Sequence, residues 1–159
     1  MKSILLFIFL STSTCIFSQD DETNWESQFV EKHFLIAAST KSYSSAKKTA
    51  EKLSKSIKLE IENRGLVPFE ESGLSFSLEE CEGSGWEYPC YVARGREDGT
   101  YISIEWSNAI DGFSKGYYVV IVSTQSERSE EMKNLLLEVK KVKSSAYIKS
   151  AKVYIGCMH

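Results

Sequence analysis

Two segments of the chain share nearly the same pattern of apolar and polar positions. Residues 34–42 (FLIAASTKS) and 118–126 (YVVIVSTQS) lie 84 positions apart, and each is an apolar run that ends in Ser-Thr-x-Ser. An apolar run of this length indicates a buried strand. The serines that follow it offer side-chain oxygens for the start of a helix. The pattern therefore predicts two strands, each leading into a helix.

The residues after each of these strands have helical periodicity, because their apolar positions recur three and four residues apart. In the first helix these positions are Ala46, Ala50 and Leu53. In the second helix they are Met132, Leu135, Leu136, Val139 and Val142.

A further strand is predicted after each helix. Residues 57–62 alternate apolar and charged side chains, which is the period of a strand ending at 63–65, although the same residues could extend the first helix. Residues 146–148 and 151–155 have the composition of a closing strand. The chain thus contains two β-α-β halves.

Two such halves in one short chain indicate the α+β class and a ferredoxin-like split βαβ architecture. In that architecture an antiparallel sheet carries both helices on one face. An insertion at about 66–113 separates the halves and contains two more strand candidates, 90–94 and 101–106. Asp98-Gly99 between them is a favourable hairpin turn. We therefore predict a βαβ unit, a hairpin insertion and a second βαβ unit.

The N-terminus has the features of a cleavable signal peptide. Lys2 precedes the apolar run 4–10, and the polar stretch 11–19 follows it. The run is shorter than the roughly 20 apolar residues that cross a bilayer. Cys15 is not preceded by the aliphatic residue typical of a lipoprotein signal. We therefore predict a signal peptide at 1–19 and export to the periplasm or the cell exterior, without a membrane span or a lipid anchor.

The remaining residues are predicted to form a polar leader at 20–32 and a single domain at 33–159, a length that suits one hydrophobic core. Residues 20–159 carry 18 basic and 22 acidic side chains. This mildly acidic balance, with lysines spread along the predicted helices, does not indicate a nucleic-acid partner. Nor does it indicate an anionic membrane surface.

Three cysteines follow the predicted leader. In an exported protein a pair of them is expected to be oxidised. Cys81 and Cys90 flank a segment whose glycines and proline let the chain turn back, so we predict this pair, although three cysteines allow three single pairings. Cys157 and His159 supply two ligands where zinc usually takes three or four from the protein. No metal site is predicted.

A family resemblance follows from the strand pattern. Residues 116–121 (GYYVVI) lead into a serine-containing turn and a helix rich in Lys and Glu. Over residues 33–62 and 116–156 the chain resembles the SPOR (sporulation-related repeat) domains. That resemblance implies a βαββαβ fold and binding of peptidoglycan glycan strands that lack stem peptides. The chain departs from the family through its cysteine-containing insertion and through Thr40 and Thr124, where many SPOR strands lead into a Phe-bearing turn.

Motifs for catalysis are not found. The sequence contains no nucleophile elbow, no phosphate-binding glycine loop and no paired-cysteine metal cluster. Its acidic pairs are adjacent in sequence and are explained by a solvated surface, although any two carboxylates could meet in space. We therefore predict a protein without catalytic residues or a cofactor.

The composition instead favours ligand binding by the insertion and the strand after it. Aromatic residues concentrate there beside charged ones, and such a mixture suits a sugar or a peptide. The predicted binding residues are Trp86, Tyr91, Arg94, Arg96, Glu105 and Tyr118. Strand alternation implies that at least half of the aromatics fill the core, and Arg94 and Glu105 could pair across neighbouring strands. The expected partner is cell-wall glycan or, alternatively, a protein of the envelope.

Overall fold

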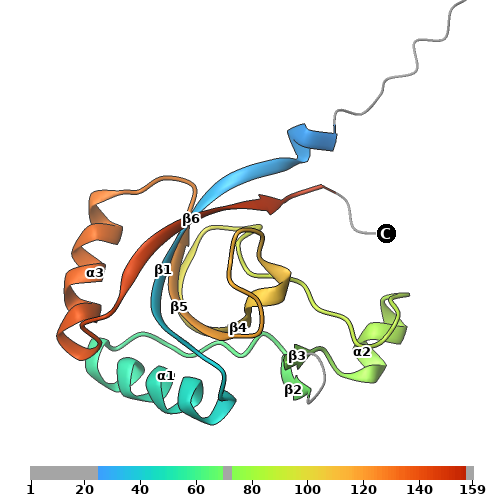
Figure 1. Ribbon diagram of the computed structural model, residues 1–159, viewed down its shortest axis with the longest axis horizontal. Helices are drawn as coiled ribbons and strands as arrows, with labels where there is room; N and C mark the ends of the chain where they lie inside the picture. Colours follow the sequence, from blue (N-terminus) through green and yellow to red (C-terminus); the bar gives the residue numbers. More distant parts are fainter. Residues whose placement is uncertain (1–24, 70–72, 157–159) are drawn as a thin grey trace, which may run out of the picture.

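The two segments that share the repeated pattern lie side by side in the main sheet. They form β1 (Phe29–Thr40) and β5 (Tyr118–Gln125), which pair antiparallel with Phe34 opposite Thr124 and Thr40 opposite Tyr118. The computed structural model describes residues 25–69 and 73–156 (Figure 1). Within them the sheet has the order β4-β5-β1-β6, all antiparallel, with β4 at Gly99–Trp106 and β6 at Tyr147–Tyr154.

In the part of the chain that the structure describes, three helices and a small hairpin complete the regular structure. The helices are α1 (Tyr43–Ile57), α2 (Leu78–Gly83) and α3 (Glu130–Val142). The hairpin pairs β2 (Val67–Phe69) with β3 (Gly73–Ser75). Short 3-10 turns occupy Trp25–Gln28 and Ser107–Ala109. The predicted α+β class, the antiparallel sheet and both predicted helices are confirmed.

Helices α1 and α3 cover one face of the sheet (Figure 1). Leu35 and Ala37 of β1 point to this side, together with Val120 and Val122 of β5. They meet the apolar stripe of each helix, which includes Ala46, Ala50, Leu53, Met132 and Val139. Burial of these stripes stabilises helices whose outer faces are polar.

The opposite face of the sheet is covered by the residues on either side of β4, 90–98 and 107–117, which together are called the cover segment below. Phe34 and Ile36 of β1 point to this side, and Ile110 and Phe113 pack against them in a second core. The Phe34 and Phe113 rings meet edge to face at 5.6 Å. The sheet therefore lies between a helical layer and a layer without regular strands.

Serines begin both long helices, as predicted. Ser42 accepts a hydrogen bond from the Ser45 N–H at 3.4 Å, and Ser129 accepts one from Met132 N–H at 3.1 Å. Lys58, the C-cap that follows the last residue of α1, adopts a left-handed conformation with φ of 60°. Each cap satisfies a backbone group that the helix itself leaves unpaired.

The predicted strand at 57–62 is wrong. Ile57 is the last residue of α1, and residues 58–62 run along the edge of β4 with only an isolated bridge between Ile61 and Ile102. Two backbone hydrogen bonds make this bridge, from Glu62 N to Ile102 O and from Ile102 N to Glu60 O. The alternation of apolar and charged side chains in this segment suits its position along the edge of β4. The segment pairs with β4 only at this one bridge, so it is not a full strand.

The predicted hairpin of the insertion is also wrong in one of its two strands. Residues 101–106 belong to β4, but residues 90–94 have no strand structure, and β4 pairs with β5 instead. The predicted closing strand is confirmed as β6, which pairs with β1 over its whole length.

The predicted signal peptide at 1–19 lies outside the described residues, as do residues 20–24 of the predicted leader. Residues 25–32 of that leader form the 3-10 turn Trp25–Gln28 and the first part of β1. Strand β1 begins at Phe29, four positions before the predicted start of the domain at 33. Among the described residues, no helix combines the length and the apolar character that a bilayer crossing requires.

Candidate functional site

Three of the six predicted binding residues line one cavity. Tyr91, Arg94 and Arg96 form a wall of a cavity of about 200 Å³, called the Tyr91 cavity below. Its other walls come from the start of β1, the turn 109–111 and the end of β6. The cavity lies where the cover segment meets the edge of the sheet.

The Tyr91 cavity combines aromatic, cationic and acidic residues. Phe29 and Tyr154, on neighbouring strands, place their ring centroids 5.4 Å apart. Arg96 and Lys152 bring positive charge, and Asp111 brings a carboxylate. Its volume is below the roughly 300 Å³ at which sites for drug-sized ligands begin, so it suits a group of about one ring.

Glu105 lies behind this cavity and has no exposed surface. Its Oε2 accepts hydrogen bonds from Arg64 Nη1 at 2.8 Å, from the Tyr91 hydroxyl, and from the Arg94 N–H at 3.4 Å. The Tyr91 hydroxyl oxygen also accepts from the Trp106 N–H at 3.0 Å. Glu105 Oε1 has no hydrogen-bond partner among the described residues. The carboxylate thus ties the wall of the cavity to β4.

The pKa values of Tyr91 and Arg64 are both shifted by burial and by the neighbouring Glu105 carboxylate. Burial raises the pKa of Tyr91 well above its ordinary value, and the negative charge of Glu105 raises it further. For Arg64, burial lowers the pKa, but the nearby Glu105 outweighs this and the net change is upward. Tyr91 therefore donates as a neutral hydroxyl, and Arg64 remains a cation at neutral pH.

The suggested side-chain pairing of Arg94 with Glu105 does not occur, because only the backbone N–H of Arg94 reaches that carboxylate. The Arg94 guanidinium is 2% exposed and stacks 3.7 Å from the centre of the Tyr101 ring. Its donors reach four oxygens, namely Gly99 O, Tyr101 O, Ser103 Oγ and Ile121 O. Burial lowers its pKa to about 10. Arg94 thus anchors the cover segment and is not free for a ligand.

Arg96 holds the end of the last strand against the cover segment. Its guanidinium donates to the carbonyls of Tyr154 at 3.3 Å, Ile155 at 3.1 Å and Gly156 at 2.7 Å. It remains half-buried at the cavity. Arg96 and the exposed Lys152 are the two cations placed to meet a ligand there.

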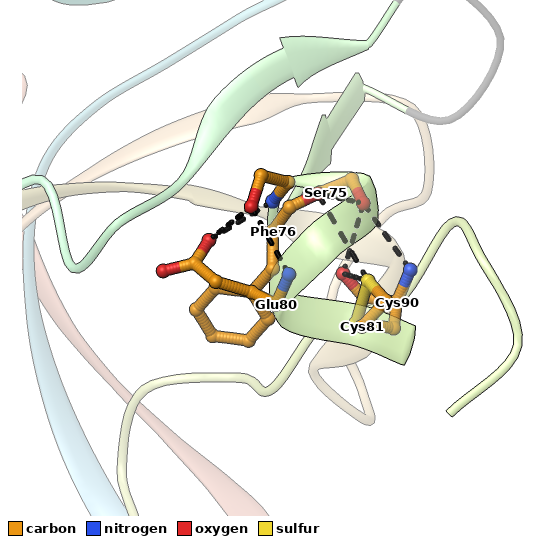
Figure 2. The surroundings of a disulfide bond; sticks show 6 residues. Ser75, Phe76, Glu80, Cys81 and Cys90 are labelled. Carbon is orange, nitrogen blue, oxygen red and sulfur yellow. Dashed lines mark hydrogen bonds between the residues drawn. A yellow bond between two sulfur atoms is a disulfide. The ribbon is translucent and has the colours of Figure 1, made fainter. Parts of the chain in front are cut away.

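The predicted disulfide is confirmed. Figure 2 shows Cys81 of α2 bonded to Cys90, with an S–S distance of 2.04 Å and a Cα–Cα distance of 5.8 Å. Ser75 of β3 helps to hold Cys90 in place, because its Oγ accepts from the Cys90 N–H at 3.2 Å. The single hydroxyl proton of Ser75 has two acceptors within reach, Phe76 O at 2.7 Å and Cys90 O at 3.1 Å. The cover segment therefore leaves Cys90 from an anchored position, directly before Tyr91.

Trp86 and Tyr118 do not join the Tyr91 cavity. Trp86 is half-buried in the disulfide loop, where its N–H donates to Cys81 O at 2.9 Å. Tyr118 packs against Trp106 with ring centroids 4.9 Å apart, and its hydroxyl donates to Gly73 O at 3.1 Å. Tyr118 therefore connects the main sheet to the small hairpin.

Several residues of the site were not predicted from the sequence. Arg64, the ionic partner of Glu105, lies 41 positions away from it in a segment that was expected only to end a strand. Phe29, Asp111 and Lys152 line the cavity from three separate segments. No local motif marks these residues, because the pairing of β6 with β1 brings Phe29 and Lys152 together and the packing of the cover segment adds Asp111.

Among residues 25–69 and 73–156 there is no group of three or more His, Cys, Asp or Glu side chains that could hold a metal ion. The weak metal pair considered from the sequence, Cys157 and His159, lies outside the described residues. Comparisons with protein-family models, with curated proteins and with solved structures gave no match. The proposal below therefore depends on the site itself.

Proposed function

We propose that this protein is an exported, non-catalytic binding module of the cell envelope whose Tyr91 cavity takes one carboxylate-bearing sugar unit of the peptidoglycan glycan. The observation that carries the proposal is the lining of that cavity, which joins Phe29 and Tyr154 to the cations Arg96 and Lys152. Aromatic rings stack on the apolar faces of sugars, while charged donors orient a carboxylate. The exported location is part of the proposal and rests on the N-terminal sequence pattern.

The proposal also assigns the chain to the ferredoxin-like split βαβ arrangement. Support comes from the strand order β4-β5-β1-β6 and from α1 and α3, which share one face of the sheet. In this assignment β1-α1-β4 and β5-α3-β6 are the two halves. The small hairpin and α2 are then additions between α1 and β4.

The position of the ligand differs from that expected for a SPOR-like sheet. A glycan lying across the sheet needs an uncovered face, but α1 and α3 cover one face and the cover segment packs on the other. We therefore place the sugar at the border of the cover segment, beside Lys152 of β6.

Co-sedimentation with purified sacculi tests this proposal. The chain from residue 20 is expected to pellet with sacculi, both intact and stripped of stem peptides. Lys152→Gln is expected to weaken binding about fivefold, which corresponds to roughly 1 kcal/mol for a partly exposed charged hydrogen bond. Lys143→Gln, which removes an exposed lysine after α3, is the matched control and is expected to bind like the wild type. Failure of the wild-type protein to pellet would refute the proposed function. Equal binding by Lys152→Gln and Lys143→Gln would refute the Tyr91 cavity as the place where the sugar binds.

The alternative function is a protein-interaction domain that acts as an inhibitor or an accessory subunit. Two observations favour it: β6 is an edge strand of the sheet, and Tyr147 and Ile155 near its ends are 44% and 40% exposed. A stoichiometric envelope protein retained by the wild type and lost with Tyr147→Ala, which removes an exposed ring from the β6 edge, would support this alternative. Sacculus binding without any protein partner would count against it.

A further inference from the structure

Positive charge is concentrated on one helix of this acidic protein. Residues 41–58, which comprise α1 and its flanks, contain six lysines and one glutamate, a net charge of +5. The other residues between 20 and 159 contain 12 basic and 21 acidic side chains, a net charge of −9. The mildly acidic net charge is therefore the sum of two parts of the chain whose net charges have opposite sign.

The lysines of α1 lie on its outer face. At about 100° per residue, Lys48, Lys52 and Lys55 project opposite to the buried stripe of Ala46, Ala50 and Leu53. All three lysines are exposed, and none forms an ion pair with another described residue. Helix α1 lies at the periphery of the molecule, with the sheet on one side of it (Figure 1). These three residues are called the α1 lysine face below.

Both helices have lysine in the last turn, but α1 lacks the acidic first turn that α3 has. The first turn of α3 contains Glu130 and Glu131, which complement the positive end of the helix dipole. The first turn of α1 contains no acidic residue. Lys48 and Lys52 are four positions apart and Lys52 and Lys55 are three apart, so like charges face each other along the helix. Glu51, three positions after Lys48 and four before Lys55, is the one acidic residue of this helix and offsets only part of that repulsion.

The two helices also differ in how their lysines are paired. On α3, Lys133 bonds to Glu130, and Lys141 bonds to Glu138 at 2.6 Å. No lysine of the α1 lysine face has such a partner among the described residues. Unfavourable local charge placement is expected where a surface serves a function. An anionic partner would remove the repulsion on α1.

We propose that the α1 lysine face docks the protein on an anionic phospholipid surface. The face is the outer surface of a helix, and its three lysines line none of the best-formed cavities among the described residues, but its three ammonium groups can reach a plane of phosphates together. Lys48 to Lys55 covers about 10 Å along the helix axis. Each lysine near such a surface strengthens binding about fivefold, which is roughly 1 kcal/mol. The net negative remainder of the chain favours the orientation in which α1 meets the membrane.

This inference does not depend on the proposed glycan function, since α1 contributes no residue to the Tyr91 cavity. It also changes the expectation drawn from overall charge, which did not indicate an anionic membrane surface. Overall charge averages over the molecule, whereas surface binding depends on the charges within about 8 Å of the membrane at physiological ionic strength.

Vesicle co-sedimentation tests the proposal with the chain from residue 20 in its oxidised form. The vesicles are phosphatidylcholine alone, or phosphatidylcholine and phosphatidylglycerol in equal parts, at low and at high salt. One variant combines Lys48→Gln, Lys52→Gln and Lys55→Gln. The matched control combines Lys133→Gln, Lys140→Gln and Lys141→Gln on α3. Both variants lose three charges, and glutamine has nearly the helix propensity of lysine.

The wild type is expected to bind only the anionic vesicles, and to release them at high salt. The α1 variant is expected to bind about 100-fold more weakly, from about fivefold per lysine, and the α3 variant less than fivefold more weakly. An equal loss in both variants would overturn the proposal, because net charge alone would then explain the binding. Absence of wild-type binding to the anionic vesicles, or binding to sacculi that depends on the α1 lysine face, would overturn it as well.

Discussion

Glu105 determines how the cover segment lies on the sheet. Its buried carboxylate holds Arg64, the Tyr91 hydroxyl and the Arg94 N–H at one point. Burying a carboxylate is costly unless a cation and hydrogen-bond donors compensate it. Arg64 and Tyr91 supply that compensation, so the cluster acts as a unit.

Removal of Glu105 is expected to destabilise the protein strongly. Glu105→Ala leaves Arg64 largely buried without its counterion, and we expect a loss of about 3 to 5 kcal/mol in the free energy of unfolding. Tyr91→Phe removes only the hydroxyl and is expected to cost about 1 to 2 kcal/mol. Urea denaturation measures both losses. Glu62→Ala, at an exposed glutamate, is the control and is expected to stay within about 0.5 kcal/mol of the wild type. A Glu105→Ala protein as stable as that control would contradict the role of the cluster.

The ion pair between Lys32 and Asp98 makes the free energy of unfolding depend on pH in the acid range. Partial burial opposes the charge on Asp98, but hydrogen bonds from Lys32 at 2.7 Å and Ser126 at 3.1 Å, together with the charge of Lys32, give a lowered pKa. The folded-state pKa is thus below the unfolded value of about 3.9. The stabilisation is present above that pH and is lost as the pH falls through the folded-state pKa.

Asp98→Asn is therefore expected to reduce the loss of stability below about pH 4. Thermal unfolding between neutral pH and strong acid, compared with the wild type, measures this difference. Above about pH 5 the variant is expected to be the less stable protein, because Lys32, which is 6% exposed, loses its counterion. Identical pH profiles for the two proteins would show that the pair contributes nothing.

At the scale of elements, the small hairpin is joined to the main sheet through Gly73 of β3. Its φ of 85° lies in the left-handed region, and Trp106 of β4 packs directly on its backbone. Tyr118 of β5 adds a hydrogen bond to Gly73 O. A side chain at position 73 would overlap the Trp106 ring, so only glycine allows this approach.

Gly73→Ala is expected to lower the free energy of unfolding by about 2 to 4 kcal/mol, because it adds both backbone strain and overpacking. Gly85→Ala is the matched control. Gly85 also has a positive φ, of 74°, but open space surrounds it, so only the strain of about 1 kcal/mol is expected. Urea denaturation of both variants measures the difference, and equal losses would mean that the contact with Trp106 does not constrain position 73.

The disulfide joins α2 to Cys90, the residue at which the cover segment begins. Cys81→Ser with Cys90→Ser is expected to cost roughly 2 to 3 kcal/mol, the chain-entropy value for a loop of this length. Reduction of the wild type is expected to give a similar loss and to add two hydrogens to the intact mass. Backbone amide exchange in residues 91–96 is expected to increase, because Cys90 anchors them. Unchanged exchange there would show that Glu105 and Arg64 suffice to hold the segment.

At the scale of the whole molecule, the sheet is buried on both faces by unlike layers. The helical layer follows from apolar periodicity, whereas the cover segment has little regular structure and is held by Arg94, Glu105 and a few apolar anchors. The Tyr91 cavity lies at the border of the less regular layer. Regular elements thus provide the scaffold, and the irregular segment provides the candidate site.

Substitution of Phe113 tests whether the cover segment is essential to the fold. It is 8% exposed and packs against Phe34, so Phe113→Ala is expected to cost about 3 to 5 kcal/mol and to increase binding of a hydrophobic dye. Leu137→Ala, at a residue that is 60% exposed, is the control and is expected to be nearly neutral. A small effect of Phe113→Ala would mean that the cover segment contributes little to folding.

The sequence by itself determined the elements whose signal is local. Strands β1, β5 and β6 and helices α1 and α3 follow from apolar runs and helical spacing, and the Cys81–Cys90 pair follows from a short loop with turn residues. The misassigned segments, 57–62 and 90–94, are those in which a neighbour decides the conformation. The first lies on the edge of β4, and the second is held by Glu105 and Arg64.

Only the tertiary structure decided the chemistry of the site. It buried Arg94 and Glu105, which the sequence had offered as binding residues, and it brought Lys152 and Phe29 to Tyr91 and Arg96. It also placed three lysines of α1 on one outer face in a chain of acidic total charge. The physical reason is that burial and charge placement depend on contacts between residues tens of positions apart, whereas local periodicity reports only on neighbours along the chain.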